Sequence, residues 1–212
     1  MPKVIVLFGK PGAGKGTRMS EFLATTSKKF NILSVGNLLR QARADNTELG
    51  QKAATFMDNG FLVPDDIINE IVIEGIKKSE FPIISDGFPR TRGQALAMLD
   101  AGIKPVVINF EVDDNVVIQR AKDRLICKNC GEPYTTNNFK PPLVEGVCDK
   151  CGGPLHRRHD DNPEVVEHRL RVYKSETLPV LELLLNYNVE VYTIDNSNPE
   201  TAKNQFAEIM NR

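Results

Sequence analysis

Short apolar runs alternate with stretches of helical periodicity along most of the chain. Five runs have the length of short strands and are bounded by glycine, proline or polar residues: 4–8, 30–35, 82–85, 105–110 and 189–194. Helices are predicted at 17–24, 37–43, 48–57, 64–76, 91–101, 113–124 and 163–187, and again from Pro199. This alternation is typical of an α/β fold with a doubly wound, parallel, five-stranded sheet.

Two segments interrupt the alternation. The helices at 37–43 and 48–57 are short and end at Asp58-Asn59-Gly60, which favours a small flap inserted between two strands. From Cys127 to about Asp161 the sequence is rich in glycine, proline, asparagine and lysine, without sustained periodicity. The 212 residues, 41% of them hydrophobic, can bury one substantial core. We therefore expect a single α/β core with two insertions.

The charge balance narrows the range of partners. Lys and Arg number 27 against 28 Asp and Glu, for a net charge of -1, so we expect neither nucleic acid nor a membrane as a partner. The apolar run at 4–8 is too short for the core of a signal peptide, and no run approaches the ~18 residues needed to span a bilayer. These features predict a cytoplasmic protein.

The glycine-rich segment Gly9–Thr17 lies between the first predicted strand and the first helix. Its glycines let the backbone curl so that several N–H groups point into one concavity, beside a helix N-terminus. Lys15 can reach a terminal phosphate from this position, so the segment predicts a polyphosphate site. The general pattern has Ser or Thr after the lysine to help hold Mg²⁺, whereas this chain has Gly16.

Charged residues surround the predicted phosphate site. Asp86 follows strand 82–85, at the sheet edge where parallel α/β proteins bind ligands, and its carboxylate suits a metal ion. Six arginines lie near the predicted edges of the cleft: Arg40, Arg90, Arg120, Arg124, Arg158 and Arg169. Any one of them could be a solvated surface charge. As a set they favour phosphoryl transfer, because that reaction depends on electrostatic clamping by Arg, Lys and Mg²⁺.

All four cysteines lie in the second insertion, as two Cys-x2-Cys pairs with 17 residues between them: Cys127, Cys130, Cys148 and Cys151. This spacing matches a four-thiolate zinc site, which leaves no position for water and so predicts a structural metal. Metal binding would supply folding free energy to a segment too small for its own core. Two disulfides or four free thiols are the alternatives. The mixed charges of the insertion disfavour a nucleic-acid-binding ribbon.

These motifs together resemble the adenylate kinases, in particular the long form with a zinc-binding lid. The segments that carry the resemblance follow the family's order over nearly the whole chain: Gly9–Thr17, Leu62-Val63-Pro64-Asp65, Asp86-Gly87-Phe88-Pro89-Arg90-Thr91 with Gln94, the four cysteines, and Arg158-His159-Asp160-Asp161. The resemblance implies a P-loop NTPase fold with a core at 1–33, 64–123 and 162–212, an NMP-binding flap at 34–63 and a zinc-ribbon lid at 124–161. It also implies a monomer that converts Mg·ATP and AMP into two ADP.

The resemblance further implies roles for individual residues. ATP would be bound by Gly12, Ala13, Gly14, Lys15, Gly16, Thr17, Arg120, Arg124 and Asn198. AMP would be bound by Val35, Arg40, Val63, Gly87, Arg90, Gln94, Arg158 and Arg169. Catalysis would use Lys15, Asp86, Arg90, Arg124, Arg158 and Arg169. A nucleoside monophosphate has a second pKa near ~6, so it needs no general base. We therefore expect His156, His159 and His168 at the surface, without a catalytic role.

Several residues depart from the family's usual pattern. Lys10 adds a charge near the phosphates, and Leu125 replaces an arginine common in the family's lid. Near the acceptor base, Val35 and Asn37 stand where the family usually has Thr and Asp. These last two changes leave a UMP/CMP-type kinase as an alternative, although Gln94 could pair with adenine through two hydrogen bonds. A nucleotide-switched zinc-ribbon binding module is the alternative from another class.

Overall fold

The main sheet has five parallel strands in the order β2-β3-β1-β4-β8. Their bounds are β1 (Val4–Gly9), β2 (Asn31–Ser34), β3 (Ile83–Asp86), β4 (Val106–Glu111) and β8 (Glu190–Asp195). The computed structural model describes residues 2–137, 140–158 and 161–212. The sheet confirms the predicted fold class, because each apolar run forms a strand and each crossover contains a helix.

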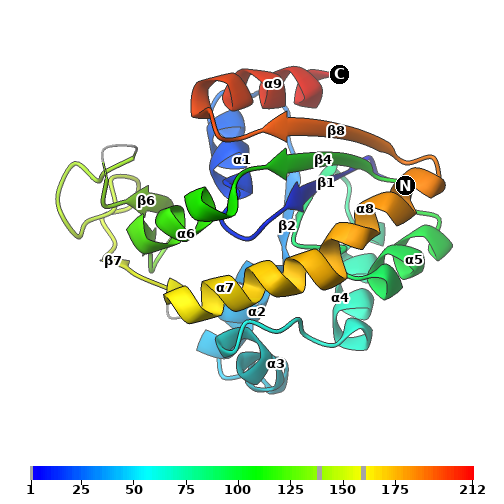
Figure 1. Ribbon diagram of the computed structural model, residues 1–212, viewed down its shortest axis with the longest axis horizontal. Helices are drawn as coiled ribbons and strands as arrows, with labels where there is room; N and C mark the ends of the chain where they lie inside the picture. The colour runs from blue at the N-terminus through cyan, green and yellow to red at the C-terminus, as the bar shows by residue number, and fades with distance from the viewer. Residues whose placement is uncertain (1, 138–139, 159–160) are drawn as a thin grey trace.

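Helices cover both faces of the sheet (Figure 1). They are α1 (Lys15–Leu23), α4 (Asp65–Lys77), α5 (Arg92–Asp100), α6 (Asp114–Asp123), α7 (Pro163–Val172), α8 (Leu178–Asn186) and α9 (Pro199–Asn211). Side chains of the central strand β1 alternate between the two faces. Val4 and Val6 pack into the core shared with α4, α5 and α8, whereas Ile5 and Leu7 pack into the core shared with α1, α6 and α9. Two apolar layers therefore hold β1 rigidly beneath the loop that follows it.

The predicted helix at 163–187 contains a change of helical type. α7 and α8 are joined without a break by a π-helical turn, η2 (Tyr173–Thr177). Pro179 has no N–H with which to bond the carbonyl of Ser175, so the regular α-helical ladder cannot run through this point. The sequence pattern predicted the extent of the helix, but the structure corrects its regularity.

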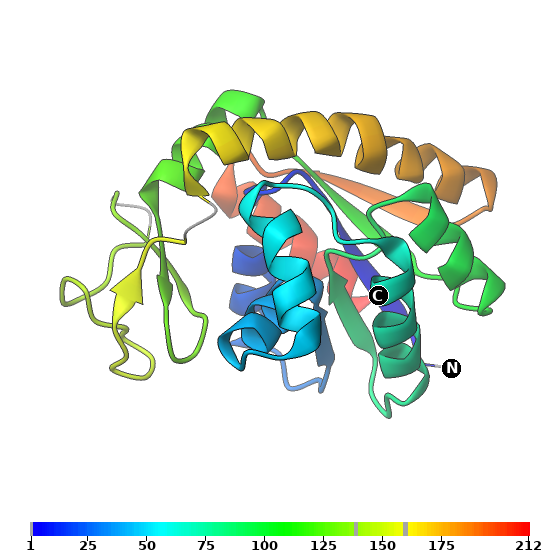
Figure 2. The same cartoon turned by 90° about the horizontal axis from the view of Figure 1, so that it is seen from below.

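The two insertions have different architectures. The first consists of two packed helices, α2 (Val35–Ala44) and α3 (Glu48–Asp58). The second contains a three-stranded antiparallel sheet in the order β6-β5-β7, formed by β5 (Arg124–Cys127), β6 (Pro133–Thr135) and β7 (Leu155–His156). This second insertion projects from the main body (Figure 2). Among the described residues, no helix combines the length and apolarity needed to cross a membrane.

Candidate active site

A cavity of about 630 Å³ opens at the carboxyl ends of strands β1 and β3. It extends from the phosphate loop to α2 and the first turn of α5, and reaches the cysteine-bearing insertion. Most of the predicted site residues line it: Gly12, Gly14, Lys15, Gly16, Thr17, Val35, Arg40, Val63, Asp86, Gly87, Arg90, Gln94, Arg120, Arg124, Arg158 and Arg169. The topology thus brings residues from the whole length of the chain to one site.

The phosphate loop curls as its glycines predict. Gly9 has φ 131, and a Cβ there would lie 2.4 Å from the Phe110 carbonyl oxygen, so no larger residue fits beside β4. Lys15 folds back over the loop, and its Nζ donates to the carbonyls of Gly9 and Lys10 at 2.9 Å each. The loop therefore positions an ammonium group above its own concavity.

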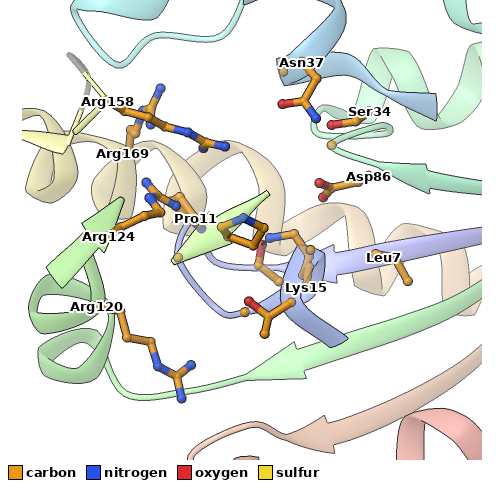
Figure 3. A pocket seen from close by; sticks show the side chains of 18 of the residues that line it. Leu7, Pro11, Lys15, Ser34, Asn37, Asp86, Arg120, Arg124, Arg158 and Arg169 are labelled. Carbon is orange, nitrogen blue, oxygen red and sulfur yellow. Dashed lines mark hydrogen bonds between the residues drawn. The ribbon is translucent and has the colours of Figure 1, made fainter. Parts of the chain in front are cut away.

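Burial lowers the pKa of Lys15 to about 8. Asp86 opposes this shift, while the positive charges of Arg90 and Arg124 add to it. The side chains of Lys15 and Asp86 lie near each other at the centre of the cavity (Figure 3). An anionic ligand at this position would relieve the repulsion among the cations.

Lys10 points away from the cavity, contrary to the expectation that it adds a charge near the phosphates. Its Nζ donates to the Val112 carbonyl at 2.7 Å and lies 2.6 Å from Asp114 Oδ1. The other oxygen of Asp114 lies 2.6 Å from the Lys174 ammonium. Hydrogen bonds from Lys10, which has the larger effect, and from Lys174 lower the pKa of Asp114. Lys10 therefore ties the phosphate loop to the start of α6 and to the π-helical turn.

The segment after β3 supplies an acid and a buried arginine. Asp86 ends the strand, and Gly87 follows with φ 91. The Arg90 guanidinium packs over Gly87, so that a Cβ at position 87 would lie 2.7 Å from Arg90 Nη2. Burial lowers the pKa of Arg90, and the negative charge of Asp86 counteracts this. Asp86 and Arg90 therefore present opposite charges to the cavity from one short turn.

Three more arginines come from the second insertion and α7. Figure 3 shows Arg124, Arg158 and Arg169 together on one side of the cavity, with Asp86 across from them. Arg124 forms a two-pronged ion pair with Asp161, through Nε at 2.8 Å and through Nη2. The group can surround a phosphate, because guanidinium groups match phosphate oxygens in geometry.

The end of the cavity beside α2 has an apolar wall and an arginine, Arg40. Val35 and Val63 are both 7% exposed and form an apolar wall. Arg40 donates to Asn37 Oδ1 at 2.7 Å, so a neutral amide occupies the place where an acid would pair with the arginine. The side chain of Gln94 is also buried here. This end suits a heterocyclic base next to a phosphate-binding arginine.

At the other end, Arg120 and Asn196 flank the phosphate loop. Arg120 Nη2 donates to the Asn196 carbonyl at 2.7 Å, and the buried Asn196 amide donates to the Ala13 carbonyl. Asn196 was not among the residues expected at the site, whereas the expected Asn198 has an exposed side chain that caps α9. Neither Ala13 nor Asn198 is among the described residues that line the cavity. Asn196 directly follows strand β8, and this position at the carboxyl end of a parallel strand could have indicated it as a site residue.

The four cysteine sulfurs converge as their spacing predicts, all lying within 4.8 Å of one another. Cys127 Sγ lies 3.4 Å from Cys151 Sγ, and Cys130 Sγ lies 3.6 Å from Cys148 Sγ. Sulfurs around a tetrahedral zinc ion, with bonds of ~2.3 Å, are separated by about 3.8 Å. The donor set and its spacing therefore fit one zinc ion.

Hydrogen-bond donors are directed at the sulfur cluster. The Tyr134 hydroxyl accepts from the Asp149 N–H at 2.8 Å and lies 3.4 Å from Cys148 Sγ, to which it can donate. Burial raises the pKa of Cys148, but the hydrogen bonds from Tyr134 and from backbone N–H groups outweigh this and lower it to about 6. These donors favour the thiolate, which is the form that binds a metal.

The two histidines that the structure describes lie outside the cavity wall. His156 and His168 are half-buried rather than fully at the surface, and neither is among the described residues lining the cavity. The His168 ring packs edge-on against Phe61 with centroids 4.6 Å apart. The prediction for His159 lies outside the described residues.

A doubly wound sheet with a phosphate loop and a cationic cavity at its carboxyl edge defines a P-loop nucleotide-binding protein. A protein-family model described as "Adenylate kinase" matches residues 7–189. The chain belongs to the adenylate kinase family.

Curated relatives agree with the family assignment. An adenylate kinase of Caldicellulosiruptor bescii is 44% identical over 84% of this chain and 85% of its own length. One of Listeria innocua is also 44% identical, over 84% of this chain and 85% of its own. One of a Thermoanaerobacter species is 40% identical over 92% of both chains.

Proposed function

We propose that the chain catalyses reversible phosphoryl transfer from Mg·ATP to AMP, giving two ADP. One observation carries the proposal: a single cavity extends from the phosphate loop to the wall formed by Val35, Val63 and Gln94. Lys15 and Asp86 line the same cavity, with Arg124, Arg158 and Arg169 across from Asp86 (Figure 3). A donor nucleotide on the loop and an acceptor beside that wall would thus meet with their phosphates among the cations.

The donor half of the site would bind ATP. Gly12, Gly14, Gly16 and Thr17 would cradle the phosphates together with Lys15, since backbone N–H groups at a helix N-terminus attract anions. Ala13 would contribute by fixing the conformation of the loop, because its carbonyl accepts hydrogen bonds from Arg120 and Asn196. Arg120 would pack on the base. Asn198 would contribute only by capping α9 beside Pro199, which does line the cavity.

The acceptor half would bind AMP. Arg40 and Arg90 would hold its phosphate, while Val35, Val63 and Gly87 would form the walls around the nucleoside. Gln94 would contact the edge of the base. Arg158 and Arg169 also line this cavity, and we expect them to reach both nucleotides. All the residues expected to bind AMP line one cavity, which supports this division.

The site would promote the transfer by positioning the two nucleotides and by stabilising the charge that develops on the transferring phosphoryl group. The acceptor phosphate is already largely ionised at neutral pH and acts as its own nucleophile, so no side chain has to remove a proton. Lys15, Arg124, Arg158 and Arg169 would stabilise the charge that spreads over the transferring oxygens. Closure of a flap at 34–63 and a lid at 124–161 would exclude water as a competing acceptor.

Two metals fit the described residues. Asp86 would orient Mg²⁺ that arrives with ATP, and this ion would neutralise phosphate charge. The four cysteines would hold a structural Zn²⁺ that cross-links the two Cys-x2-Cys pairs of the lid. Thiolate ligands need a reducing compartment, which supports a cytoplasmic location. That the chain acts as a monomer stays a prediction.

A coupled assay for ADP with AMP, CMP, UMP and GMP as acceptors tests the proposal. We expect ADP formation at an enzymatic rate with AMP, and a Lys15→Met variant that stays folded but loses turnover. Faster transfer to UMP or CMP would favour the pyrimidine kinase alternative. ATP binding by folded protein without transfer to any acceptor would refute the proposal.

A further inference from the structure

A set of hydrogen bonds at the acceptor end of the cavity fixes the side-chain amide of Gln94. This side chain lies in the first turn of α5 and is only 3% exposed. Its Oε1 accepts from the Arg90 backbone N–H at 2.7 Å, and its Nε2 donates to Asp65 Oδ1 at 2.8 Å. The amide is thus held between the loop after β3 and the first turn of α4.

Each partner of the amide can act in one way only. A backbone N–H donates and a carboxylate accepts, so a reversed amide would place donor against donor and acceptor against acceptor. The second oxygen of Asp65 is also engaged, because Thr91 Oγ1 donates to Oδ2 at 2.6 Å. The same hydroxyl accepts from the backbone N–H of Gln94 at 3.1 Å. The chemistry of Asp65 and Arg90 therefore sets the orientation of the amide.

Gly93 leaves the space that the Asp65 carboxylate occupies. A Cβ at position 93 would lie 2.6 Å from Asp65 Oδ2, so an alanine there would push the carboxylate aside without removing its charge. Asp66 is the next residue in the same helical turn, and it is exposed. The chain thus provides a variant that displaces Asp65 and a neighbouring acid that serves as a matched control.

We propose that Asp65 is a positioning residue that determines which bases the acceptor site takes. The inference rests on the proposed function. A glutamine amide has two donor hydrogens and two lone pairs, and the contacts with Asp65 and Arg90 use one of each. One donor and one acceptor are left for a ligand in the cavity that Gln94 lines.

In the fixed orientation these two groups match a 6-amino purine, whose N1 accepts and whose amino group donates. A 6-oxo purine in the same position presents the reverse, because its N1–H donates and its O6 accepts. Asp65 would thereby select adenine although it does not touch the base. The apolar Val35 does not supply this selectivity, since it has no hydrogen-bonding group in its side chain.

The test compares AMP with IMP, which has a hypoxanthine base of nearly the same shape. In Asp65→Asn the new amide can donate as well as accept, so that reversal of the Gln94 amide is opposed only by the Arg90 backbone N–H. We expect the ratio of kcat/KM for AMP to that for IMP to fall by about tenfold or more. The change should lie in the KM for the acceptor, with the KM for ATP unaltered. Asp66→Asn, which loses the same charge from the same turn, should keep the wild-type ratio.

Gly93→Ala provides a second route, which decides the matter if Asp65→Asn does not fold. It should lower the AMP-to-IMP ratio in the same direction, and calorimetric binding of the two acceptors should show the same loss of discrimination. An unchanged ratio in an active Asp65→Asn or Gly93→Ala variant would overturn the inference and leave the proposed function standing. No transfer to AMP by the unmodified chain would overturn both.

Discussion

Replacing Lys10 by methionine removes the charge that joins the phosphate loop to the start of α6. Lys10 Nζ is bonded to the Val112 carbonyl at 2.7 Å and to Asp114 at 2.6 Å, and its side chain is 22% exposed. A hydrogen bond from a charged group contributes roughly 1.5–3 kcal/mol. The ion pair with Asp114, whose side chain is 33% exposed, adds less than about 1 kcal/mol after solvent screening.

We therefore expect Lys10→Met to lose about 2 kcal/mol in the free energy of unfolding. For a chain of this length that corresponds to a Tm lower by about 4–8 °C, measurable by calorimetry. Asp114 has a lowered pKa in the folded state, so its share of the stability is present above ~3.9 and is lost as pH falls through the folded value. The difference between the two proteins should accordingly shrink in strong acid.

Lys174→Met is the matched control for this experiment. It removes the other cation beside the same carboxylate, but its side chain is 57% exposed and belongs to the π-helical turn. We expect Lys174→Met to lose less than about 1 kcal/mol in the free energy of unfolding.

The KM for ATP should rise less than about tenfold in Lys10→Met, because the Lys10 ammonium faces away from the cavity. An unchanged Tm with a much larger rise in this KM would show that Lys10 contacts the nucleotide, and would refute the reasoning.

Two further predictions concern the lid metal and Lys15. The purified chain should contain about one zinc ion, and chelation should speed hydrogen exchange in β5 and β6 before β1; metal-free protein with Cys–Cys bonds would contradict the thiolate site. Because the pKa of Lys15 is about 8 in the folded chain and ~10.4 unfolded, the nucleotide-free protein should gain stability as pH rises between these values. ATP binding should weaken over the same range. Denaturant unfolding of wild type and Lys15→Met across this window checks the sign, and equal slopes would count against it.

Local sequence signals were sufficient for the main sheet and the phosphate loop. β1, β3 and β4 are mainly apolar runs, so their length and position are encoded locally, whereas β2 and β8 mix apolar with polar residues. The strands of the second insertion could not be predicted from the sequence in this way. Its strands are two to four residues long, too short for alternation to be visible, and they are arranged by the converging cysteines.

Contacts between distant residues account for what the sequence did not reveal. Lys10 was expected to add a charge near the phosphates, because nothing local indicates its partner at Val112, 102 positions away. Asn196 and Asn198 have the same chemistry, and only the path of the chain after β8 places Asn196 against the loop. The orientation of Gln94 similarly depends on Asp65, 29 positions earlier. Such assignments require the packed structure, since no periodic pattern links the partners.

The π-helical turn between α7 and α8 sets the rotational phase of one helix against the other. Before the turn, Val166 and Leu170 point into one core layer, and after it Val180 and Leu184 point into the other. Each residue of an α-helix advances the side-chain direction by ~100°. Deleting a single residue from Tyr173–Thr177 would rotate Val180 and Leu184 off the sheet by about that angle. The extra length of this turn is thus what allows one unbroken helix to serve both faces of the molecule.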